Sequence, residues 1–283
     1  MWLLISNITV VVFGITILLL VWLRRRSAIK RLRQLADEAE TSRQQIIIEQ
    51  NRNRQIKQEM TNNIAHELKT PVASIRGYLE ILLSGRPIDP NRRQYFLDRC
   101  YQQTLRLSSL INDVSLINKL EESSDLFPIE PVDLYLVANE AVNELSDRAE
   151  ADRVLVFNNL PSDVIVQGNK GLLYAIFRNL IENAISYAGQ DIRVVMECYK
   201  SDADHYYLHF YDTGCGVASE YLPKLFDRFL RIDSGRSRKM GGTGLGLSIV
   251  KHAVLFHGGD IYANNRPDGG LEFFFSIKTD NRN

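Results

Sequence analysis

The sequence predicts a multidomain protein with one N-terminal transmembrane helix, a helical hairpin that forms half of a four-helix bundle, and a C-terminal α/β sandwich. Three observations predict this architecture: an uncharged apolar run opens the chain, helical sequence without glycine or proline follows, and helix-like and strand-like segments alternate beyond residue 134. The 283 residues suffice for more than one domain. Equal numbers of basic and acidic residues, 34 each, give no reason to expect a nucleic-acid partner.

The apolar run covers residues 3–23 and is long enough to span a bilayer core. Trp2 and Trp22 are separated by roughly 30 Å of helix, as an aromatic belt at each interface requires. Arg24 to Arg26 follow the run, whereas the charges of a cleaved signal peptide precede it. We therefore expect a single-pass anchor in the cell (cytoplasmic) membrane with residues 24–283 in the cytoplasm. A buried helix of a soluble domain is the alternative.

Residues 24–55 are expected to form a juxtamembrane coiled coil. One heptad frame collects apolar residues of this region and its continuation, namely Leu32, Ala36, Ala39, Ile46 and Met60. The remaining core positions of that frame are polar: Arg43, Gln50, Asn53 and Lys57. The pattern predicts a long helix that pairs weakly with a second copy, and a solvated single helix is the alternative.

Residues 56–122 are expected to form a helical hairpin that dimerises. The first helix carries an apolar stripe with spacings of four, four, three, four and three: Ile64, Leu68, Val72, Ile75, Leu79 and Leu82. Turn residues follow in 85–90, and the stripe of the second helix, over 95–120, is Phe96, Cys100, Leu107, Leu110, Val114 and Ile117. Two helices bury such stripes poorly alone, which favours a four-helix bundle made by two chains.

Two prolines and a run of acids place a linker in residues 121–134, and we expect the α/β sandwich over 123–278, followed by a tail at 279–283. Helices are predicted at 134–149, 171–187 and 245–256. Strands are predicted at 154–158, 164–167, 192–200, 206–212, 260–264 and 271–278.

The segment "IAHELKTPVASIRG" places a histidine on the outside of the first hairpin helix. At about 100° per residue, His66 lies roughly 160° from both Ile64 and Leu68, so its imidazole faces solvent. Lys69 and Thr70 share its face. An exposed neutral imidazole is a competent nucleophile. A passive surface histidine is the alternative.

Two neighbours of His66 favour a functional role. Glu67 lies about a quarter turn away and can accept the ring proton. Pro71 removes a helical hydrogen bond one turn later, at a cost of about 3 kcal/mol, which predicts a bend at the histidine.

Polar side chains share one face of the helix predicted at 171–187: Asn179, Glu182, Asn183, Ser186 and Tyr187. Such amides and a carboxylate suit a hydrated Mg²⁺ with its phosphates, and a solvated face is the alternative. Asp212 ends a strand just before Gly214 and Gly216. Its carboxylate needs a donor, which the amine of adenine would supply, whereas an Asp-Thr-Gly tight turn is the alternative.

A glycine-rich run, "GGTGLGLSIVKHAV", leads into the last predicted helix. Glycine backbone at a helix N-terminus suits a polyphosphate. A basic segment rather than a strand precedes the run, so the context excludes a dinucleotide fingerprint, and the P-loop pattern is absent from the sequence. We expect the basic segment, "DSGRSRKM", to form a loop over phosphates.

Together these motifs resemble membrane sensor histidine kinases of two-component systems over residues 56–278. The matching motifs are "HELKTP" at 66–71, the H box; "NLIEN" at 179–183, the N box; "DTGCG" at 212–216, the first glycine box; "LFDRFLR" at 225–231, the F box; and "GGTGLGL" at 241–247, the second glycine box. The resemblance implies a Bergerat-type ATP-binding sandwich, shared with gyrase and MutL.

The resemblance also implies an activity and partners. In a homodimer, ATP would phosphorylate His66 with Glu67 as the base. The phosphoryl group would pass to an aspartate of a separate response regulator. Thr70 matches the position that orients water for dephosphorylating the regulator, which implies a phosphatase activity as well.

A site for ATP and Mg²⁺ is implied by the same motifs. Asn183 would bind Mg²⁺ with help from Asn179. Tyr187 would stack near adenine, and Asp212 would pair with its amine. Phe229 and Arg231 would anchor the lid over the nucleotide. The glycine boxes supply the remaining contacts: Gly214, Gly216, Gly242, Thr243, Gly244, Leu245 and Gly246.

Two features depart from the family pattern. Ser186 stands where many relatives carry lysine, which removes one cationic phosphate contact. Typical members also have two membrane spans around an external sensor domain, whereas one span is expected here. Two other functions therefore remain open: a non-catalytic membrane adaptor that acts by dimerisation, and an ATP-driven conformational machine.

Overall fold

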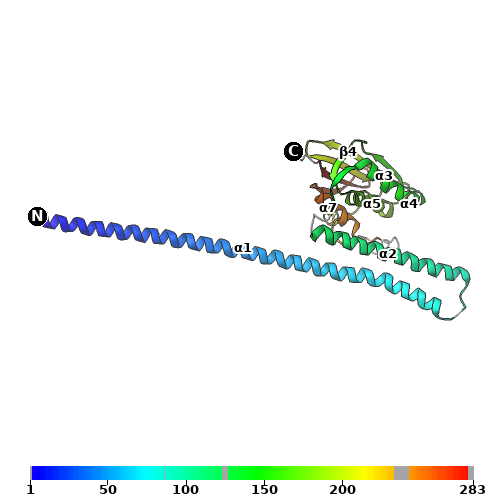
Figure 1. The fold of residues 1–283 in the computed structure, drawn as a ribbon, viewed down its shortest axis with the longest axis horizontal. Helices are drawn as coiled ribbons and strands as arrows, with labels where there is room; N and C mark the ends of the chain where they lie inside the picture. The colour runs from blue at the N-terminus through cyan, green and yellow to red at the C-terminus, as the bar shows by residue number, and fades with distance from the viewer. Residues whose placement is uncertain (1, 86, 123–126, 233–241, 280–283) are drawn as a thin grey trace. The chain divides into compact units, whose positions relative to one another are not determined.

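A computed structural model of the chain describes residues 2–85, 87–122, 127–232 and 242–279; before Glu40, side chains are described only for Gly14, Trp22 and Arg24 to Arg26. The chain divides into two compact units, Met1–Asn62 and Asn63–Asn283. Helix α1 (Trp2–Leu83) begins in the first unit and ends in the second (Figure 1).

The first unit is helical throughout, as the sequence predicts for residues 24–55. From residue 40 its described side chains are mostly exposed, including Ile46, Ile47, Ile48 and Ile56. Within the part of the chain that the structure describes, no helix is long and apolar enough to cross a membrane. Most side chains of the span predicted at 3–23 lie outside that part, so the span stays a prediction.

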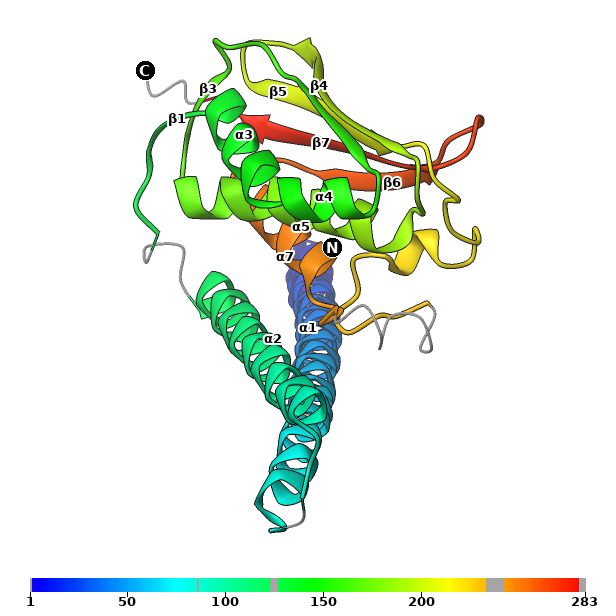
Figure 2. The ribbon, with the colours of Figure 1, turned by 90° about the vertical axis from the view of Figure 1, so that its right-hand side faces the viewer.

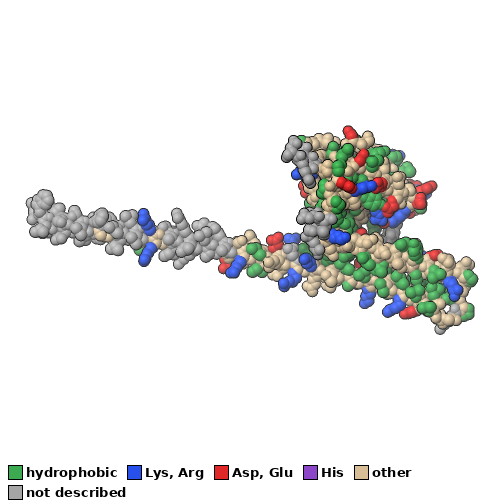
Figure 3. Space-filling model, in the orientation of Figure 1, with side chains coloured by type: hydrophobic (Ala, Val, Ile, Leu, Met, Phe, Trp, Pro, Cys, Tyr) green, Lys and Arg blue, Asp and Glu red, His purple; other side chains and the backbone are tan. Residues whose placement is uncertain are grey.

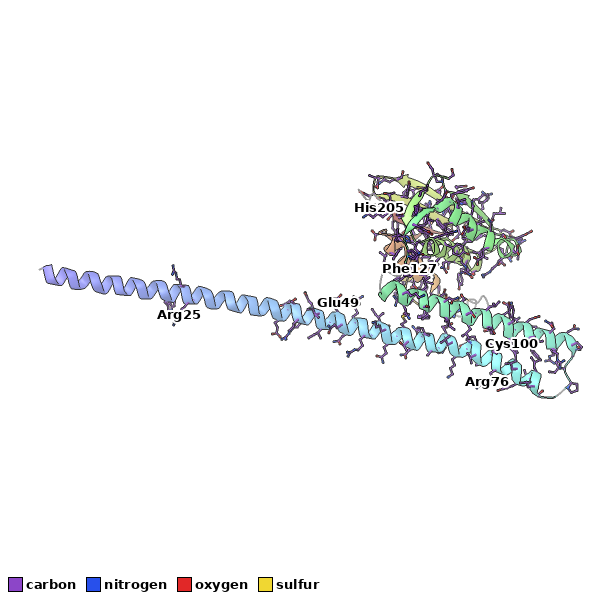
Figure 4. All side chains as sticks on the ribbon, in the orientation of Figure 1. Arg25, Glu49, Arg76, Cys100, Phe127 and His205 are labelled. Carbon is purple, nitrogen blue, oxygen red and sulfur yellow. The ribbon has the colours of Figure 1, made fainter. Side chains whose placement is uncertain are left out.

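In the second unit, α1 and α2 (Pro90–Glu122) form the predicted antiparallel hairpin. Asp89 caps α2 by accepting a hydrogen bond from the Arg92 backbone N–H at 3.2 Å. The thiol of Cys100, labelled in Figure 4, lies 3.8 Å from the Ile75 carbonyl oxygen of α1. Tyr78 and Phe96 stack across the hairpin, with ring centroids 5.6 Å apart.

Pro71 lies inside α1 and is buried, and the helix continues through it to Leu83. The proline therefore does not end the helix. The Thr70 hydroxyl donates to the His66 carbonyl oxygen at 3.4 Å, and the Ser74 hydroxyl donates to the Thr70 carbonyl oxygen at 3.1 Å. Such back-bonding often accompanies helix bending. The bend itself stays a prediction.

The remaining elements form the predicted α/β sandwich, with helices covering one face of a sheet (Figure 2). They are β1 (Glu130–Asp133), α3 (Leu134–Glu144), α4 (Ser146–Ala151), β2 (Leu155–Asn159), β3 (Ile165–Gly168), α5 (Lys170–Tyr187), β4 (Arg193–Ser201), β5 (His205–Asp212), the 3₁₀ turn η2 (Leu222–Lys224), α7 (Gly246–Phe256), β6 (Ile261–Asn265) and β7 (Leu271–Lys278). The main sheet has the order β2-β4-β5-β7-β6, in which β2 and β4 are parallel and the other neighbours antiparallel.

The core lies between this sheet and its helices. Alternate residues of β5 and β7 point inward and are almost fully buried, including Phe210 and Phe273, whose ring centroids are 6.1 Å apart. Phe177 of α5 meets Phe275 of β7 from the helical side, at 6.4 Å. The helices are thereby fixed on the sheet, with the polar face of α5 left for the site.

Two expectations about this domain were wrong. Residues 130–133, placed in a linker, form β1, which pairs antiparallel with β3 in a separate two-stranded sheet. An edge position tolerates Pro131 because the missing N–H need not serve a ladder on both sides. The helix expected over 134–149 is interrupted at Leu145, which has φ −96° and ψ 4° and separates α3 from α4.

Candidate functional site

His66 is exposed on α1, as its angular distance from Ile64 and Leu68 predicts. Those two residues are half-buried, while Lys69 and Thr70 are exposed beside the histidine. The imidazole therefore stands on a solvent-facing surface where a reactant can reach it.

Glu67 is held by two arginines from different segments. Arg106 of α2 places Nη2 3.3 Å from Oε2. Arg231, at the end of the F box, places Nη1 3.3 Å from both oxygens. All three side chains are at most 21% exposed, so solvent weakens these ion pairs less than it does surface pairs. In this arrangement N–H donors occupy both oxygens of the expected proton acceptor.

Asn179 and Asn183 lie half-buried on α5, as expected for an N box. Asn179 Nδ2 donates to the Ala175 carbonyl oxygen at 2.7 Å, and its Oδ1 lies against Gly246, where an added Cβ would come within 2.8 Å. Among the residues that the structure describes, the Asn183 side chain has no protein hydrogen bond, which leaves its amide available to a ligand.

Tyr187 ends α5 with 43% of its surface exposed. Its hydroxyl lies against the second glycine box, because a Cβ added to Gly242 would come within 2.5 Å of it. Desolvation raises the pKa of the Tyr187 phenol, and the positive charge of Arg231 opposes that rise. The phenol therefore remains protonated and able to donate a hydrogen bond near the glycines.

Asp212 is 3% exposed at the end of β5. Its Oδ1 accepts from the backbone N–H groups of Gly214 at 2.8 Å and Leu271 at 3.3 Å. Burial raises the pKa of Asp212, and those two hydrogen bonds act against the rise. The carboxylate thus does fix a tight turn, the alternative weighed from the sequence. Because both bonds use Oδ1, this role is compatible with an amine at Oδ2.

The glycines of the first box allow close backbone packing. A Cβ on Gly214 would collide with the Ala188 carbonyl oxygen after α5. Gly216 has φ +65° and lies against the side-chain amide of Asn265. A side chain at Gly214 would push the turn away from the end of α5, and one at Gly216 would push it away from Asn265.

The F box and the second glycine box meet through their backbones. Phe229 has φ 61°, and its N–H donates to the Gly244 carbonyl oxygen at 2.8 Å. Gly244 has φ +73°, and an added Cβ would come within 2.9 Å of the Phe229 Cα. Residues 233–241, which include Gly241 and the basic segment, lie outside the described residues.

Helix α7 begins at Gly246, after the buried Leu245. The Leu245 N–H donates to Thr243 Oγ1 at 3.2 Å, and the Thr243 hydroxyl in turn donates to Asp113 of α2 at 3.0 Å. Burial raises the pKa of Asp113 to about 6, although Thr243 and Arg178 act against it. Thr243 thus joins the start of α7 to the hairpin.

Sequence reasoning did not find three of these residues: Arg106, Asp113 and Arg148. Arg148 of α4 binds Glu182 Oε1 and the Ser186 hydroxyl of α5, each at 2.9 Å. Arg106 and Arg148 lie on other helices than their partners, and Asp113 of α2 meets Thr243 in the segment before α7, so their roles are set by tertiary contacts. The sequence offered only the weak signal of a charge beside an apolar stripe.

The donor set fits a nucleotide with its magnesium ion. No side chains cover the backbone at Gly242, Gly244 and Gly246, which lie at the N-terminal end of α7. The positive end of the helix dipole and the accessible N–H groups there suit phosphates. Within the described ranges, no group of three His, Cys, Asp or Glu side chains could hold a metal ion. The amide oxygens of Asn179 and Asn183 are of the oxygen-ligand type that Mg²⁺ prefers, together with water and phosphates.

Two family models match the chain: "His Kinase A (phospho-acceptor) domain" over residues 56–123 and "Histidine kinase-, DNA gyrase B-, and HSP90-like ATPase" over residues 168–281. The sensor-like histidine kinase SenX3 of Mycolicibacterium smegmatis is 32% identical over 217 residues, which are 76% of this chain and 56% of SenX3. The sensor protein kinase WalK of Staphylococcus aureus is 30% identical over 232 residues, 82% and 56% of the two chains.

Among solved structures, the Acinetobacter baumannii histidine kinase AdeS matches with a TM-score of 0.60 and 24% identity, over 76% of this chain and 98% of that chain. This likeness shows the shared fold. With both domains and these relatives, the chain belongs to the histidine kinases. It spans about half the length of the curated relatives described above, 56% of each.

Proposed function

We propose that the protein is an ATP-dependent histidine kinase that phosphorylates itself on His66. The observation that carries this proposal is the exposed imidazole beside Glu67, in the same compact unit as a glycine-lined nucleotide site. The family match and the resemblance of all five motifs support it.

In the proposed reaction, a ring nitrogen of His66 attacks the γ-phosphorus of ATP. The bond from that phosphorus to the β,γ-bridging oxygen breaks, so ADP leaves with the electron pair. Glu67 takes the proton lost by the imidazole. Arg106 and Arg231 orient this carboxylate, and their contacts leave a lone pair on Oε1 that can receive the proton.

We assign the nucleotide contacts to the polar face of α5, to the turn after β5 and to the residues that precede α7. Asn183, with help from Asn179, would hold Mg²⁺, which would neutralise charge on the phosphates. The buried carboxylate of Asp212 would pair with the adenine amine, next to Tyr187. Gly214 and Gly216 shape that turn. The remaining contacts are assigned to Phe229, Arg231, Gly242, Thr243, Gly244, Leu245 and Gly246.

The phosphoryl group would then move from His66 to an aspartate of a cognate response regulator. Thr70 is exposed one turn beyond the histidine, so its hydroxyl lies on the surface that a regulator must approach. That position supports the additional proposal that Thr70 orients water for dephosphorylating the regulator.

A homodimer is proposed for the hairpin, because its helices leave apolar side chains exposed. Green side chains gather along the hairpin in Figure 3. The large ones that are exposed by 41–63% are Val72, Leu79, Ile81, Tyr95, Leu97, Tyr101, Leu105 and Ile111. A second hairpin that covers these residues would complete a four-helix bundle.

For the rest of the chain we propose the division expected from the sequence. Residues 1–23 would form a transmembrane helix that anchors the protein in the cell membrane, and residues 24–55 would couple that anchor to the domain at 56–122. Support comes from the uncharged run and the arginines that follow it. Membrane flotation of the full chain tests this proposal, and a chain that stays at the bottom of the gradient would contradict it.

The kinase proposal is tested by incubating the full chain with γ-³²P-ATP and measuring acid-labile label. The wild type and a His205→Gln control are expected to incorporate phosphate, and His66→Gln is not. No label in the wild type, or equal label in His66→Gln, would refute the proposal. The first result favours the adaptor. ADP release that does not depend on His66 would favour the ATP-driven machine.

A further inference from the structure

Arg148 lies on α4, the short helix that Leu145 separates from α3. The guanidinium then bridges one turn of α5, with Nη1 on Glu182 Oε1 and Nη2 on Ser186 Oγ, both at 2.9 Å.

The bridge holds the guanidinium in one place. Arg178 binds the other oxygen of Glu182 at 3.0 Å, so the carboxylate that orients Arg148 is itself fixed. Ser186 is 8% exposed, whereas the Arg148 side chain is 39% exposed. One edge of the guanidinium is therefore anchored and the other is open, with more N–H donors than the two bonds use.

The guanidinium of Arg148 lies at the polar face of α5, because both of its partners are on that helix. Glu182 and Ser186 flank Asn183 on that face. The next residue, Tyr187, touches Gly242 with its hydroxyl, and the charge of Arg148 acts on that hydroxyl together with that of Arg231. A preoriented guanidinium beside the amides and the glycine loop suits an anionic ligand.

We propose that Arg148 is a nucleotide-binding residue that contacts the phosphates of ATP. This inference rests on the proposed function, because it names a residue of the same site. Ser186 takes part by accepting a hydrogen bond that orients the guanidinium. The positive charge at this position therefore comes from α4. Arg148 is a ligand contact in this proposal and Ser186 a positioning residue.

The test compares ligands that differ in phosphate. Dissociation constants for ATP and adenosine are measured on the full chain by calorimetry, with adenosine in competition. Arg148→Gln removes the charge but keeps an amide donor for Ser186, which favours folding. We expect it to weaken ATP binding about tenfold, the loss of one charge-assisted contact, and to change adenosine binding less than about twofold. Arg148→Lys, which keeps the charge, should stay within about threefold of the wild type for ATP.

Arg153→Ala is the matched control, since that arginine pairs with Asp191 at the surface and both side chains are more than 60% exposed. ATP affinity in Arg148→Gln equal to that of the wild type overturns the proposal. So does an equal loss for ATP and adenosine, which would mean that Arg148 acts through the packing of α4. Label on His66 is measured in parallel. If the wild type binds ATP but gains no label, the proposed kinase activity is refuted. The ATP and adenosine affinities then still test the phosphate contact of Arg148.

Discussion

The two parts of the second unit differ in how far a single chain buries its apolar residues. The α/β sandwich has a continuous core, in which Phe177, Phe210 and Phe273 are at most 2% exposed. In the described part of the hairpin, the large buried apolar side chains are Phe96, Leu110 and Ile117, and a larger set stays exposed. The sandwich therefore has a core of its own, whereas the proposed second copy would complete that of the hairpin. In the proposed reaction, the α/β sandwich would supply ATP to His66 of the hairpin, whose apolar surface a second copy would cover.

The largest expected effect is on the sandwich. Phe273→Ala should lower the free energy of unfolding by about 3–5 kcal/mol, because a filled core position becomes a cavity. Tyr262→Ala, on the open face of the same sheet and 54% exposed in the wild type, should cost less than about 1 kcal/mol. Denaturant unfolding of the full chain measures both. Similar losses in the two variants would contradict the assignment of the core to the helical side.

A substitution on the exposed apolar surface of the hairpin should change the dissociation constant of the dimer. Leu105→Asp puts a charge on its exposed apolar surface and should weaken dimerisation about a hundredfold, since the charge loses water when a second hairpin covers it. Sedimentation of the full chain over a concentration series measures the dissociation constant. Leu255→Asp on α7, at a site 49% exposed, is the control and should leave it unchanged. An unaltered constant in Leu105→Asp would place the interface elsewhere.

His257 ties α7 to the start of α5 and makes the sandwich sensitive to pH. Its Nε2 accepts from the Asn169 backbone N–H at 3.0 Å, and Nδ1 lies 2.7 Å from the Ala253 carbonyl oxygen, so the proton must sit on Nδ1. Burial lowers the pKa of His257 below its usual 6.5. The unfolded chain then binds the proton first, and stability is lost as pH falls below about 6.5.

Unfolding free energies between pH 7.5 and 5.5 measure this loss. Relative to His257→Leu, the wild type should lose up to about 1.4 kcal/mol per pH unit below 6.5. At pH 7.5 the variant itself should be about 2 kcal/mol less stable, because the Asn169 N–H loses its acceptor. His66→Gln serves as the exposed control. A wild type and His257→Leu with the same pH slope would show that another group titrates.

The smallest expected effect concerns the exposed surface of α1. Thr70→Ala removes one hydroxyl and should slow dephosphorylation of the cognate regulator about tenfold, the loss of one hydrogen bond to water. Autophosphorylation of His66 should stay within about twofold. Release of phosphate from labelled regulator measures the rate, with Ser74→Ala, one turn further on, as the control. If Thr70→Ala is as fast as the wild type, the phosphatase proposal must be abandoned.

Local patterns in the sequence predicted most of the sandwich. Apart from β1, its strands and the helices α5 and α7 begin and end within one residue of the predicted bounds. Apolar spacing sets these elements, and it also predicted the exposure of His66. The strand β1 was missed because Pro131 dominates a four-residue segment whose pairing partner, β3, lies more than thirty residues away.

The site was predictable only where its residues sit in a local motif. The amides of α5 and the glycines before α7 follow each other along the chain, so their patterns are visible in the sequence. Arg106 and Asp113 reach the site from α2, and Arg148 contacts α5 from α4, beyond the break at Leu145. A helix break and a tertiary ion pair depend on packing between segments, which periodicity does not encode.

The single hydrogen bond between Phe229 and Gly244 has a consequence for how freely the chain between them can vary. That bond joins the two flanks of the segment, and contacts on each side of it add to the joint: Arg231 binds Glu67, and Thr243 donates to Asp113. Lengthening such a loop is inexpensive: each doubling costs about 0.6 kcal/mol of closure entropy. Insertions and deletions between these flanking contacts should therefore cost the folded domain little free energy.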